Sequence, residues 1–374
     1  MARKTTNCIA KTNASLLIIN YAMNKNSQVF SHQYRVAIEL HKSFNETIVL
    51  TSELGEDLQS EGLPFPVRST RWQSGKTFSN LAKLLYEVLK IEWKFKPKIV
   101  FYHMTNSHAA FLAPLFRLLG KRQVLWYAHT AYPTSLAIAK KFMNAVVTST
   151  RGSSPLPDSI PLGQAIDLDI FKFQRHSLES KLMRVIHVGR IDPSKKIDEL
   201  IQWFIENRDE NNLGLLNIVG ESTYGKEDYF RYLTQKYDFA RKQKLLCFSG
   251  RINHEELGST LEEHDLFLHL FEGSLDKAVL EAVACGIPVI SINKEFLRVF
   301  GTWSRGSDSK WDKTFEQDRW ELFLLYELKA FRLYSKRQLA TELKRRRRIV
   351  ETQHSLDLWI KNLVEILKVK DADE

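Results

Sequence analysis

Three basic side chains follow one short apolar run and could bind a diphosphate. The run at residues 184–188 ends in Gly189, where the backbone can turn tightly. Arg190, Lys195 and Lys196 come next, before a segment with helical spacing. A guanidinium group, an ammonium group and the free N–H groups of a helix N-terminus all bind phosphate oxygens, so Arg190 with either lysine predicts a diphosphate site. Solvated surface charge is the alternative interpretation.

A second polar set follows the apolar run at residues 266–270. Ser274, Lys277 and Glu281 lie on a Gly-Ser turn and on the short helical segment after it. Ligands of open α/β sheets collect at the carboxyl ends of the strands, so these side chains would line the same crevice as Arg190. Glu281 could accept hydrogen bonds from a ribose diol. Alternatively, Lys277 and Glu281 form an exposed ion pair one helical turn apart.

Short apolar runs that are near-continuous predict strands buried on both faces of a parallel sheet. The runs are residues 16–19, 47–50, 98–102, 123–127, 145–148, 184–188, 215–219, 244–248, 266–270 and 287–292. Segments with apolar residues three and four apart predict the helices between most of them. These segments are residues 28–44, 79–93, 107–119, 196–206, 227–239, 255–263 and 277–284. Strand and helix therefore alternate, which predicts doubly wound α/β domains.

Composition favours an ordinary globular protein of two domains. The chain has 374 residues, and its cysteines, Cys8, Cys247 and Cys285, form no CxxC pair, which argues against a disulfide framework or a zinc ribbon. Residues 1–180 carry 22 basic and 12 acidic side chains, whereas the remainder carries 32 of each. The basic half predicts an anionic partner. No bilayer span or cleaved signal is evident, so we expect a cytoplasmic protein.

Residues 189–196, 250–252 and 274–289 resemble, in order and spacing, the donor-binding half of family 4 of the retaining glycosyltransferases. Upstream, residues 160–171 are similar to the interdomain signature of that family, and residues 125–129 to its strand that ends in an active-site histidine. The segment that begins at His354 is similar to the last helix, which returns to the first domain. The resemblance implies the GT-B fold, with two Rossmann-like domains that face each other across a cleft and a helical C-terminal extension.

The resemblance also implies domain bounds and site residues. The expected domains are residues 1–172 for the acceptor, residues 173–350 for the nucleotide sugar, and residues 351–374 for the returning helix. The implied donor-binding residues are Gly189, Lys195, Gly250, Arg251, Ser274, Lys277 and Glu281. The implied catalytic residues are His129, Arg190, Lys196, Glu272 and Asp276. No metal or other cofactor is expected.

The chain departs from the family pattern at two places. The usual Gly-Gly loop after the first strand corresponds to residues 24–33, which contain no glycine. The usual pair of glutamates eight residues apart is incomplete, because Gly273 stands eight residues before Glu281 and Glu272 stands nine before it. One carboxylate is therefore missing, shifted to Glu272 or replaced by Asp276.

Other motifs favour structural roles. Asp167 and Asp169 have the DxD form that binds metals in other glycosyltransferases, but a turn or cap is the preferred interpretation. The histidines at positions 103, 108, 187, 254, 264 and 269 lack ligand spacing and are interpreted as ordinary surface or core residues. The basic run at residues 344–348 resembles a nucleic-acid patch but is interpreted as a solvated helix face, so no nucleic acid is expected.

The resemblance thus implies a retaining, metal-independent hexosyltransferase that transfers sugar from a nucleoside diphosphate sugar to a glycan or lipid-linked acceptor. Cell-envelope glycan synthesis is the expected setting. The alternatives are a degenerate relative that binds nucleotide sugars without turnover, and a nucleic-acid binder suggested by the pI of 9.3. Residues 76–98 combine helical apolar spacing with lysines, so they could rest on an anionic membrane at its inner face or pack on the sheet.

Overall fold

The computed structural model describes residues 11–25, 30–55, 58, 62–73, 75–174, 182–223, 225–304 and 319–368. The chain divides into two units, Met1–Gly163 with Asp357–Glu374, and Gln164–Leu356. The division after Gly163 precedes the bound expected after residue 172, and the return to the first unit begins at Asp357 instead of residue 351. Cys8 and the polar stretch 175–181, on which the expected bound depended, lie outside the described residues.

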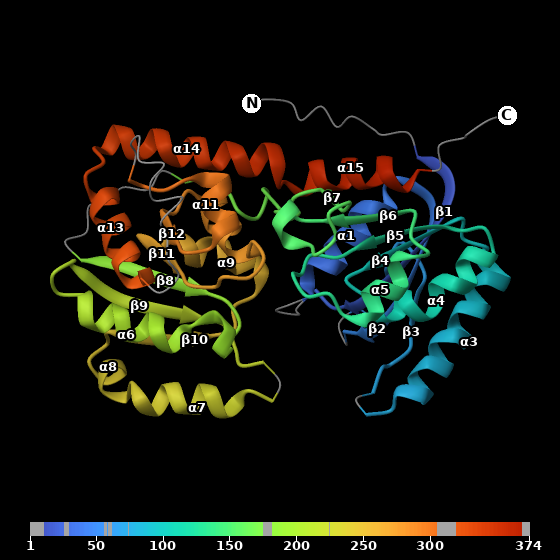
Figure 1. Ribbon diagram of the computed structural model, residues 1–374, viewed down its shortest axis with the longest axis horizontal. Coiled ribbons are helices and arrows are strands. Elements are labelled where there is room, and N and C mark those ends of the chain that lie inside the picture. Colours follow the sequence, from blue (N-terminus) through green and yellow to red (C-terminus); the bar gives the residue numbers. More distant parts are fainter. Residues whose placement is uncertain are drawn as a thin grey trace. The chain divides into compact units, whose positions relative to one another are not determined.

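The first unit contains a seven-stranded sheet in the order β3-β2-β1-β4-β5-β6-β7, with every neighbouring pair parallel (Figure 1). Its strands are β1 (Thr12–Met23), β2 (Phe44–Leu54), β3 (Val67–Ser69), β4 (Ile99–His103), β5 (Arg122–Trp126), β6 (Ala145–Thr148) and β7 (Ile160–Pro161). The five predicted strands of this unit are confirmed. The short edge strands β3 and β7 were not predicted, because two or three residues carry no periodic signal.

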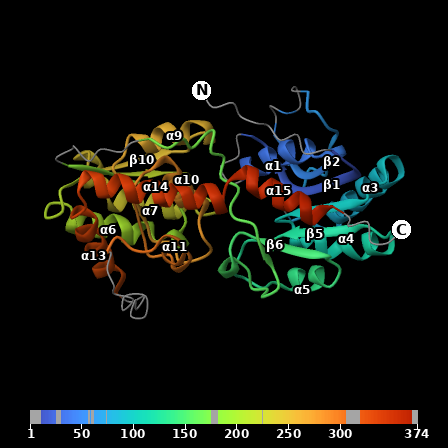
Figure 2. The same ribbon diagram turned by 90° about the horizontal axis from the view of Figure 1, so that it is seen from above.

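Helices surround this sheet and one of them comes from the end of the chain (Figure 2). They are α1 (Ser31–His41), α3 (Thr77–Phe95), α4 (Asn106–Leu118), α5 (Thr134–Lys140) and α15 (Leu356–Leu367). On α15 the indole of Trp359 is buried and stacks on His103, with ring centroids 6.1 Å apart. Arg122 of β5 donates two hydrogen bonds to the carbonyl of Ile366, at 3.0 and 2.9 Å. These contacts fix α15 to the first unit.

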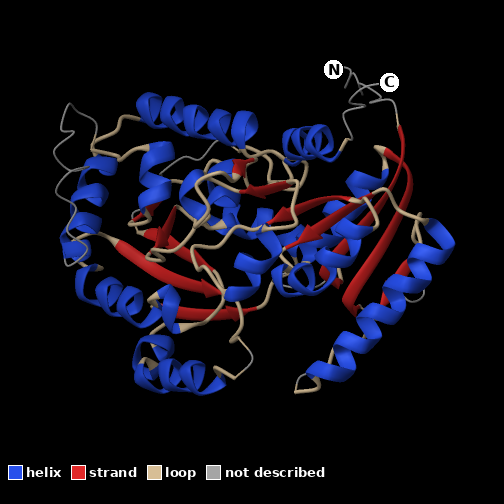
Figure 3. Ribbon diagram, turned by 45° about the vertical axis from the view of Figure 1, so that its right-hand side comes forward, coloured by secondary structure: helices blue, strands red, loops and turns tan. Residues whose placement is uncertain are grey.

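The second unit contains a five-stranded parallel sheet in the order β10-β9-β8-β11-β12. Its strands are β8 (Met183–Val188), β9 (Leu213–Val219), β10 (Leu246–Gly250), β11 (Leu266–His269) and β12 (Val289–Ser291), all predicted and now confirmed. Figure 3 shows helices, in blue, around the red strands. The helices of this unit are α6 (Ile197–Asn207), α7 (Glu227–Lys236), α8 (Asp238–Lys242), α9 (His254–Glu262), α10 (Lys277–Cys285), α11 (Lys294–Phe300), α13 (Trp320–Arg332) and α14 (Lys336–Gln353). Both sheets are Rossmann-like, as the sequence predicts.

The strand order of the second unit reverses between β8 and β11. The chain first adds β9 and β10 on one side of β8 and then crosses to place β11 on the other side. The loops after β8 and β11 therefore leave the sheet in opposite directions and open a crevice between them at the carboxyl ends. Val185 pairs with Leu266 and Ile186 with Phe267, so the two strands end at the same level.

The basic run of α14 holds the second unit together. Arg346 is buried, its Nε donates to Glu342 at 3.0 Å, and its guanidinium lies 3.9 Å from the ring centroid of Trp303. Arg347 donates to the carbonyls of Phe171 and Ala284, both at 2.6 Å. The interpretation as a solvated face is wrong for these two arginines, since internal carbonyl, carboxylate and aromatic groups bind them. No helix in the described part of the chain is long and apolar enough to cross a bilayer.

Candidate functional site

The loop after β8 turns two lysines towards the crevice. Asp192 accepts a hydrogen bond from the N–H of Ser194 at 2.9 Å and starts a short 3-10 turn, Pro193–Lys195. Lys196 then adopts a left-handed conformation, with φ of 52°, and α6 begins at the next residue. The chain thus changes direction between two consecutive lysines, which lets both side chains reach the loop after β11.

Lys195 is buried, with 5% of its surface exposed. Its ammonium group forms an ion pair with Asp276 and lies 3.7 Å from the ring centroid of Phe271. A cation between a carboxylate and an aromatic face is held at a defined place. The interpretation as solvated surface charge is therefore wrong for Lys195.

Asp276 stands at the N-cap position of α10 but does not cap the helix with its side chain. Its Oδ2 accepts from Lys195 and lies 3.4 Å from Nε2 of His269. Burial opposes ionisation, yet the Lys195 ammonium and the His269 hydrogen bond hold the pKa of Asp276 well below its ordinary value. The carboxylate is thus ionised at neutral pH, and both of these contacts fall on one of its two oxygens.

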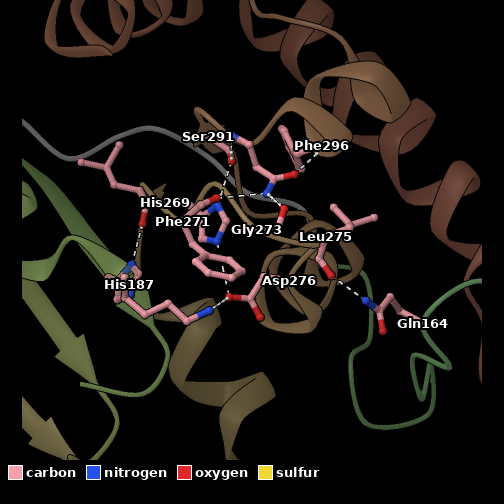
Figure 4. Close-up of polar contacts among 12 residues, drawn as sticks. Gln164, His187, His269, Phe271, Gly273, Leu275, Asp276, Ser291 and Phe296 are labelled. Atoms are coloured by element: carbon pink, nitrogen blue, oxygen red, sulfur yellow. Dashed lines mark hydrogen bonds and ion pairs between the residues drawn. The ribbon is translucent and has the colours of Figure 1, made fainter. Parts of the chain in front are cut away.

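His269 connects Asp276 to the next strand (Figure 4). Its Nδ1 lies 2.8 Å from Oγ of Ser291, which accepts a hydrogen bond from the N–H of Asn293 at 3.1 Å. Because that N–H donates, the Ser291 hydroxyl is able to donate to Nδ1, which assigns the proton of the neutral imidazole to Nε2, towards Asp276. Burial lowers the pKa of His269, although Asp276 opposes this shift.

His187, near the end of β8, lies beside His269. The ring centroids are 6.4 Å apart and nearly parallel, at 16°. Nδ1 of His187 donates to the carbonyl of Leu268 at 3.0 Å, and burial lowers its pKa to about 4. A Cβ at Gly189 would lie 3.3 Å from Nε2 of His187, so a larger residue there would crowd the ring. The motif thus needs a small residue at position 189.

Lys196 and Arg190 complete the basic side of the crevice. Lys196 forms an ion pair with Glu272, and Arg190 is exposed to solvent. Gly250 ends β10 with a φ of 66°, and a guanidinium nitrogen of Arg251 lies 3.9 Å from a carboxylate oxygen of Glu221. Each lysine of the β8 loop therefore faces one carboxylate of the β11 loop.

Glu281 lies on the buried side of α10, with 4% of its surface exposed. Its Oε1 lies 2.9 Å from Nε2 of His254 on α9. Lys277, one turn earlier, is partly buried; burial lowers its pKa, while the attraction of Glu281 and Asp167 raises it. The alternative of an exposed Lys277–Glu281 pair is wrong, because Glu281 points inwards and bonds to His254.

Gly273 has no space for a side chain. A Cβ there would overlap the ring of Phe271. The loop is held in this form by Asn293, whose Nδ2 donates to the carbonyls of Phe271 at 3.0 Å and Gly273 at 2.9 Å. A carboxylate eight residues before Glu281 is thus excluded unless Phe271 moves. Ser274, the next residue, is partly buried.

His129 belongs to the first unit, where it follows β5. It is exposed, and its Nδ1 accepts a hydrogen bond from the N–H of Ala131 at 2.9 Å. Asp167 accepts from the N–H of Asp169 at 3.1 Å, which is the turn expected for this pair. Among the residues that the structure describes, no three His, Cys, Asp or Glu side chains are grouped so that they could hold a metal ion.

Sequence reasoning missed the two stacked histidines of the crevice. Their lack of ligand spacing favours ordinary structural roles for His187 and His269. The available signal was their position, since each stands at or next to the last residue of a strand beside the switch point.

Comparison with known proteins agrees with this geometry. Residues 169–301, all within the second unit, match the model of the family described as glycosyl transferases group 1. The match includes β8 to β12 and every residue of the crevice named above. No curated protein matches the chain at a significant level.

Solved structures extend the likeness over nearly the whole length of the chain. Anabaena Alr3699/HepE in complex with UDP-glucose superposes with a TM-score of 0.72 at 14% identity, over 95% of this chain and 99% of that one. Sucrose-phosphate synthase from Thermosynechococcus elongatus gives 0.70 at 13% identity, over 95% and 98%. A glycosyltransferase from Rickettsia africae gives 0.71 at 12% identity, over 96% and 100%. At such low identity these likenesses show the fold, which is GT-B.

Proposed function

We propose that this protein is a retaining glycosyltransferase of family 4, which transfers a sugar from a nucleoside diphosphate sugar to an acceptor hydroxyl. The observation that carries the proposal is the arrangement at the switch point of the second unit. There, two lysines of the β8 loop form ion pairs with two carboxylates of the β11 loop, and Arg190 of the β8 loop is exposed. Cations suit the diphosphate of a donor, and carboxylates suit the hydroxyls of its sugar.

In this proposal Arg190 and Lys196 bind the diphosphate, and Lys195 lies behind them. Negative charge grows on the diphosphate as the bond to the sugar breaks, so the cations stabilise the transition state more than the bound donor. The same side chains supply the positive charge that a metal ion would otherwise provide, which is why we expect transfer without one. Glu281 binds the ribose diol, and Gly250, Arg251, Ser274 and Lys277 belong to the donor site.

Asp276 is our choice for the carboxylate that contacts the transferred sugar. Lys195 and His269 occupy Oδ2, so the carboxylate is fixed in position and Oδ1 points to a different side. Glu272 is the other candidate, but its carboxylate forms an ion pair with Lys196. His129 would act on the same sugar from the first unit, which we propose binds the acceptor.

The donor and the acceptor follow from the same reasoning. The HepE structures contain UDP and UDP-glucose, so uridine diphosphate hexoses are the first donors to test. A glycan or lipid-linked acceptor of the cell envelope, reached from the cytoplasmic side, fits the basic first half of the chain, which carries 22 basic and 12 acidic residues up to residue 180.

A second candidate is a degenerate protein that binds nucleotide sugars without turnover. It is favoured by Gly273, which carries no carboxylate at the usual position, and by the glycine-free loop at residues 24–33, of which 26–29 lie outside the described residues. Turnover separates the two functions. We expect the wild-type chain to release UDP from one UDP-hexose, faster when an acceptor is added, and Asp276→Asn to reduce that rate at least tenfold. Donor binding by the wild-type chain without any release of nucleotide would establish the second candidate.

A further inference from the structure

Helix α3 of the first unit has two apolar faces. The inner face contains Asn80, Leu84, Val88 and Ile91, which are buried. Leu84, Val88 and Ile91 pack in the core with the strands of the sheet. A helix needs only one apolar stripe to attach to a sheet. The remaining apolar residues of α3 therefore require a different explanation.

The second stripe, here called the outer face of α3, consists of Phe78, Leu85, Leu89 and Trp93. Their spacings of seven, four and four residues place them on one side of the helix. Phe78 is 91% exposed and Trp93 is 84% exposed, and Leu89 is more than half exposed. Single exposed apolar residues are ordinary, but a stripe of four large ones along one helix is a typical interaction surface.

Lysines lie along one flank of this stripe. Lys83, Lys90 and Lys94 are exposed and recur at spacings of seven and four residues, so they share one side of the helix. The Lys90 ammonium lies 4.1 Å from the ring centroid of Tyr86, which is also exposed. Helix α3 has two acidic residues. Glu87 is half-buried and shares the side of the three lysines, and Glu92 is half-buried and forms a 2.8 Å ion pair with Lys121 of the same unit.

We propose that the outer face of α3 docks on an anionic lipid bilayer. The phenyl, indole and leucine side chains would enter the boundary between head groups and acyl chains, where Trp is favoured. The lysines of the flank would lie at the level of the lipid phosphates. Charge complementarity selects this occupant, because three exposed lysines against one half-buried carboxylate, Glu87, leave this side of the helix with a net positive charge that an anionic surface would balance. The proposal goes beyond the proposed function and does not depend on it.

Vesicle flotation tests the proposal. The full chain is mixed with phosphatidylcholine vesicles, with or without phosphatidylglycerol, at about 0.1 M and about 1 M salt, where the screening length falls from about 10 Å to about 3 Å. We expect binding to the anionic vesicles at low salt, and its loss at high salt or without phosphatidylglycerol.

Two variants test the apolar residues and the lysines of this surface separately. Phe78→Ser with Leu89→Ser and Trp93→Ser replaces the three most exposed residues of the apolar stripe, and we expect at least a hundredfold loss of vesicle affinity. Lys83→Glu with Lys90→Glu and Lys94→Glu should lose about a hundredfold or more, since each lysine near the surface contributes about a factor of five. All six side chains are exposed, so the fold should persist. Trp93→Ala alone, with an expected loss of about tenfold, is the milder second test.

The matched control changes the same number of charges on the second unit. Lys329, Arg337 and Lys344 are exposed there, and their replacement by Glu should leave vesicle binding within about threefold of the wild type. Equal losses in this control and in the α3 lysine variant would overturn the proposal, because net charge alone would then explain binding. No binding of the wild type at low salt would also overturn it. A third result would overturn it as well: in sedimentation the wild type is a dimer and the stripe variant is a monomer. A second copy of the chain would then be the occupant of the outer face of α3.

Discussion

Replacing Asp276 by Asn should lower the free energy of unfolding of the second unit and yet strengthen diphosphate binding. The substitution keeps the shape of the side chain and removes its charge. Lys195, which is buried, would then lose the carboxylate that neutralises it. In the wild-type protein that carboxylate repels any anion that approaches Lys195, so the two effects have opposite signs.

The magnitudes follow from the geometry. Two unit charges in contact attract by about 4 kcal/mol at an effective dielectric constant of about 20. The Asp276 side chain is 20% exposed, and Asn still accepts a hydrogen bond, so we expect the free energy of unfolding of the second unit to fall by about 2 kcal/mol. The carboxylate also repels a diphosphate held by Arg190 and Lys196 in front of Lys195. At roughly 6 Å and an effective dielectric constant of about 60, which suits a site open to water, this repulsion is about 1 kcal/mol, or about fivefold in affinity.

Thermal unfolding of the second unit, with and without nucleoside diphosphate, measures both effects. Asp276→Asn should unfold at a lower temperature than the wild type, show a larger stabilisation by the diphosphate, and transfer sugar more slowly. The low pKa of Asp276 means that its stabilisation is present above the pKa of an unfolded aspartate, about 3.9, and is lost as the pH falls below it. The difference between variant and wild type should therefore shrink below about pH 4.

The control for this substitution is Glu263→Gln, which removes a 65% exposed carboxylate that lies 3.4 Å from Arg184. It should change stability by less than about 1 kcal/mol and leave diphosphate binding unchanged. If Asp276→Asn behaves like this control, the ion pair with Lys195 does not organise the site and our reasoning is refuted.

Three further predictions concern other residues. His129→Ala should nearly abolish transfer but preserve diphosphate binding, because it lies in the first unit; equal losses of stability and activity would instead indicate a structural histidine. Glu281→Gln should weaken nucleotide binding about tenfold in calorimetry, and an unchanged affinity would remove Glu281 from the ribose site. The pKa of His187 is about 4 in the folded protein and about 6.5 in the unfolded chain. As the pH falls, the unfolded chain therefore binds a proton at His187 first. The free energy of unfolding should thus fall by about 2 kcal/mol from pH 6.5 to pH 5. His187→Gln should remove that part of the pH dependence in thermal unfolding, and an unaltered profile would contradict the assignment.

The strands could be predicted because their signal is local. Each predicted run is apolar, short and buried on both faces, as in β4, where all five residues are buried. Helices α5 and α11, each of seven residues, escaped prediction because so short a segment has less than two full periods. The structure divides the chain after Gly163, whereas the expected bound follows residue 172. Polar composition marks a surface segment, which need not be the point where the contacts pass from one unit to the other.

The pairing of the site residues could not be predicted from spacing. Lys195 and Asp276 are 81 residues apart, and only the strand order brings their loops to one crevice. Glu281 was expected to face either ribose or Lys277, but its bond to His254 depends on how α9 packs beside α10. On α3 the apolar spacing was visible, yet two stripes share that helix, and the sequence does not tell which one the sheet covers.

The central claim is that the loops after β8 and β11 hold a nucleoside diphosphate. Calorimetric titration of the full chain with UDP, GDP and ADP in metal-free buffer tests it most directly, with Arg190→Ala, Lys196→Ala and Lys195→Ala as variants. Arg231→Ala is the control, since Arg231 is exposed on α7 and contacts Asp228 at 2.8 Å. We predict that one diphosphate binds the wild type and the control equally, and that Arg190→Ala and Lys196→Ala each weaken it more than tenfold, which corresponds to about 1.5 to 3 kcal/mol for a charge-assisted contact. An unchanged affinity of Arg190→Ala, or no binding of any diphosphate to the wild type, would contradict the claim.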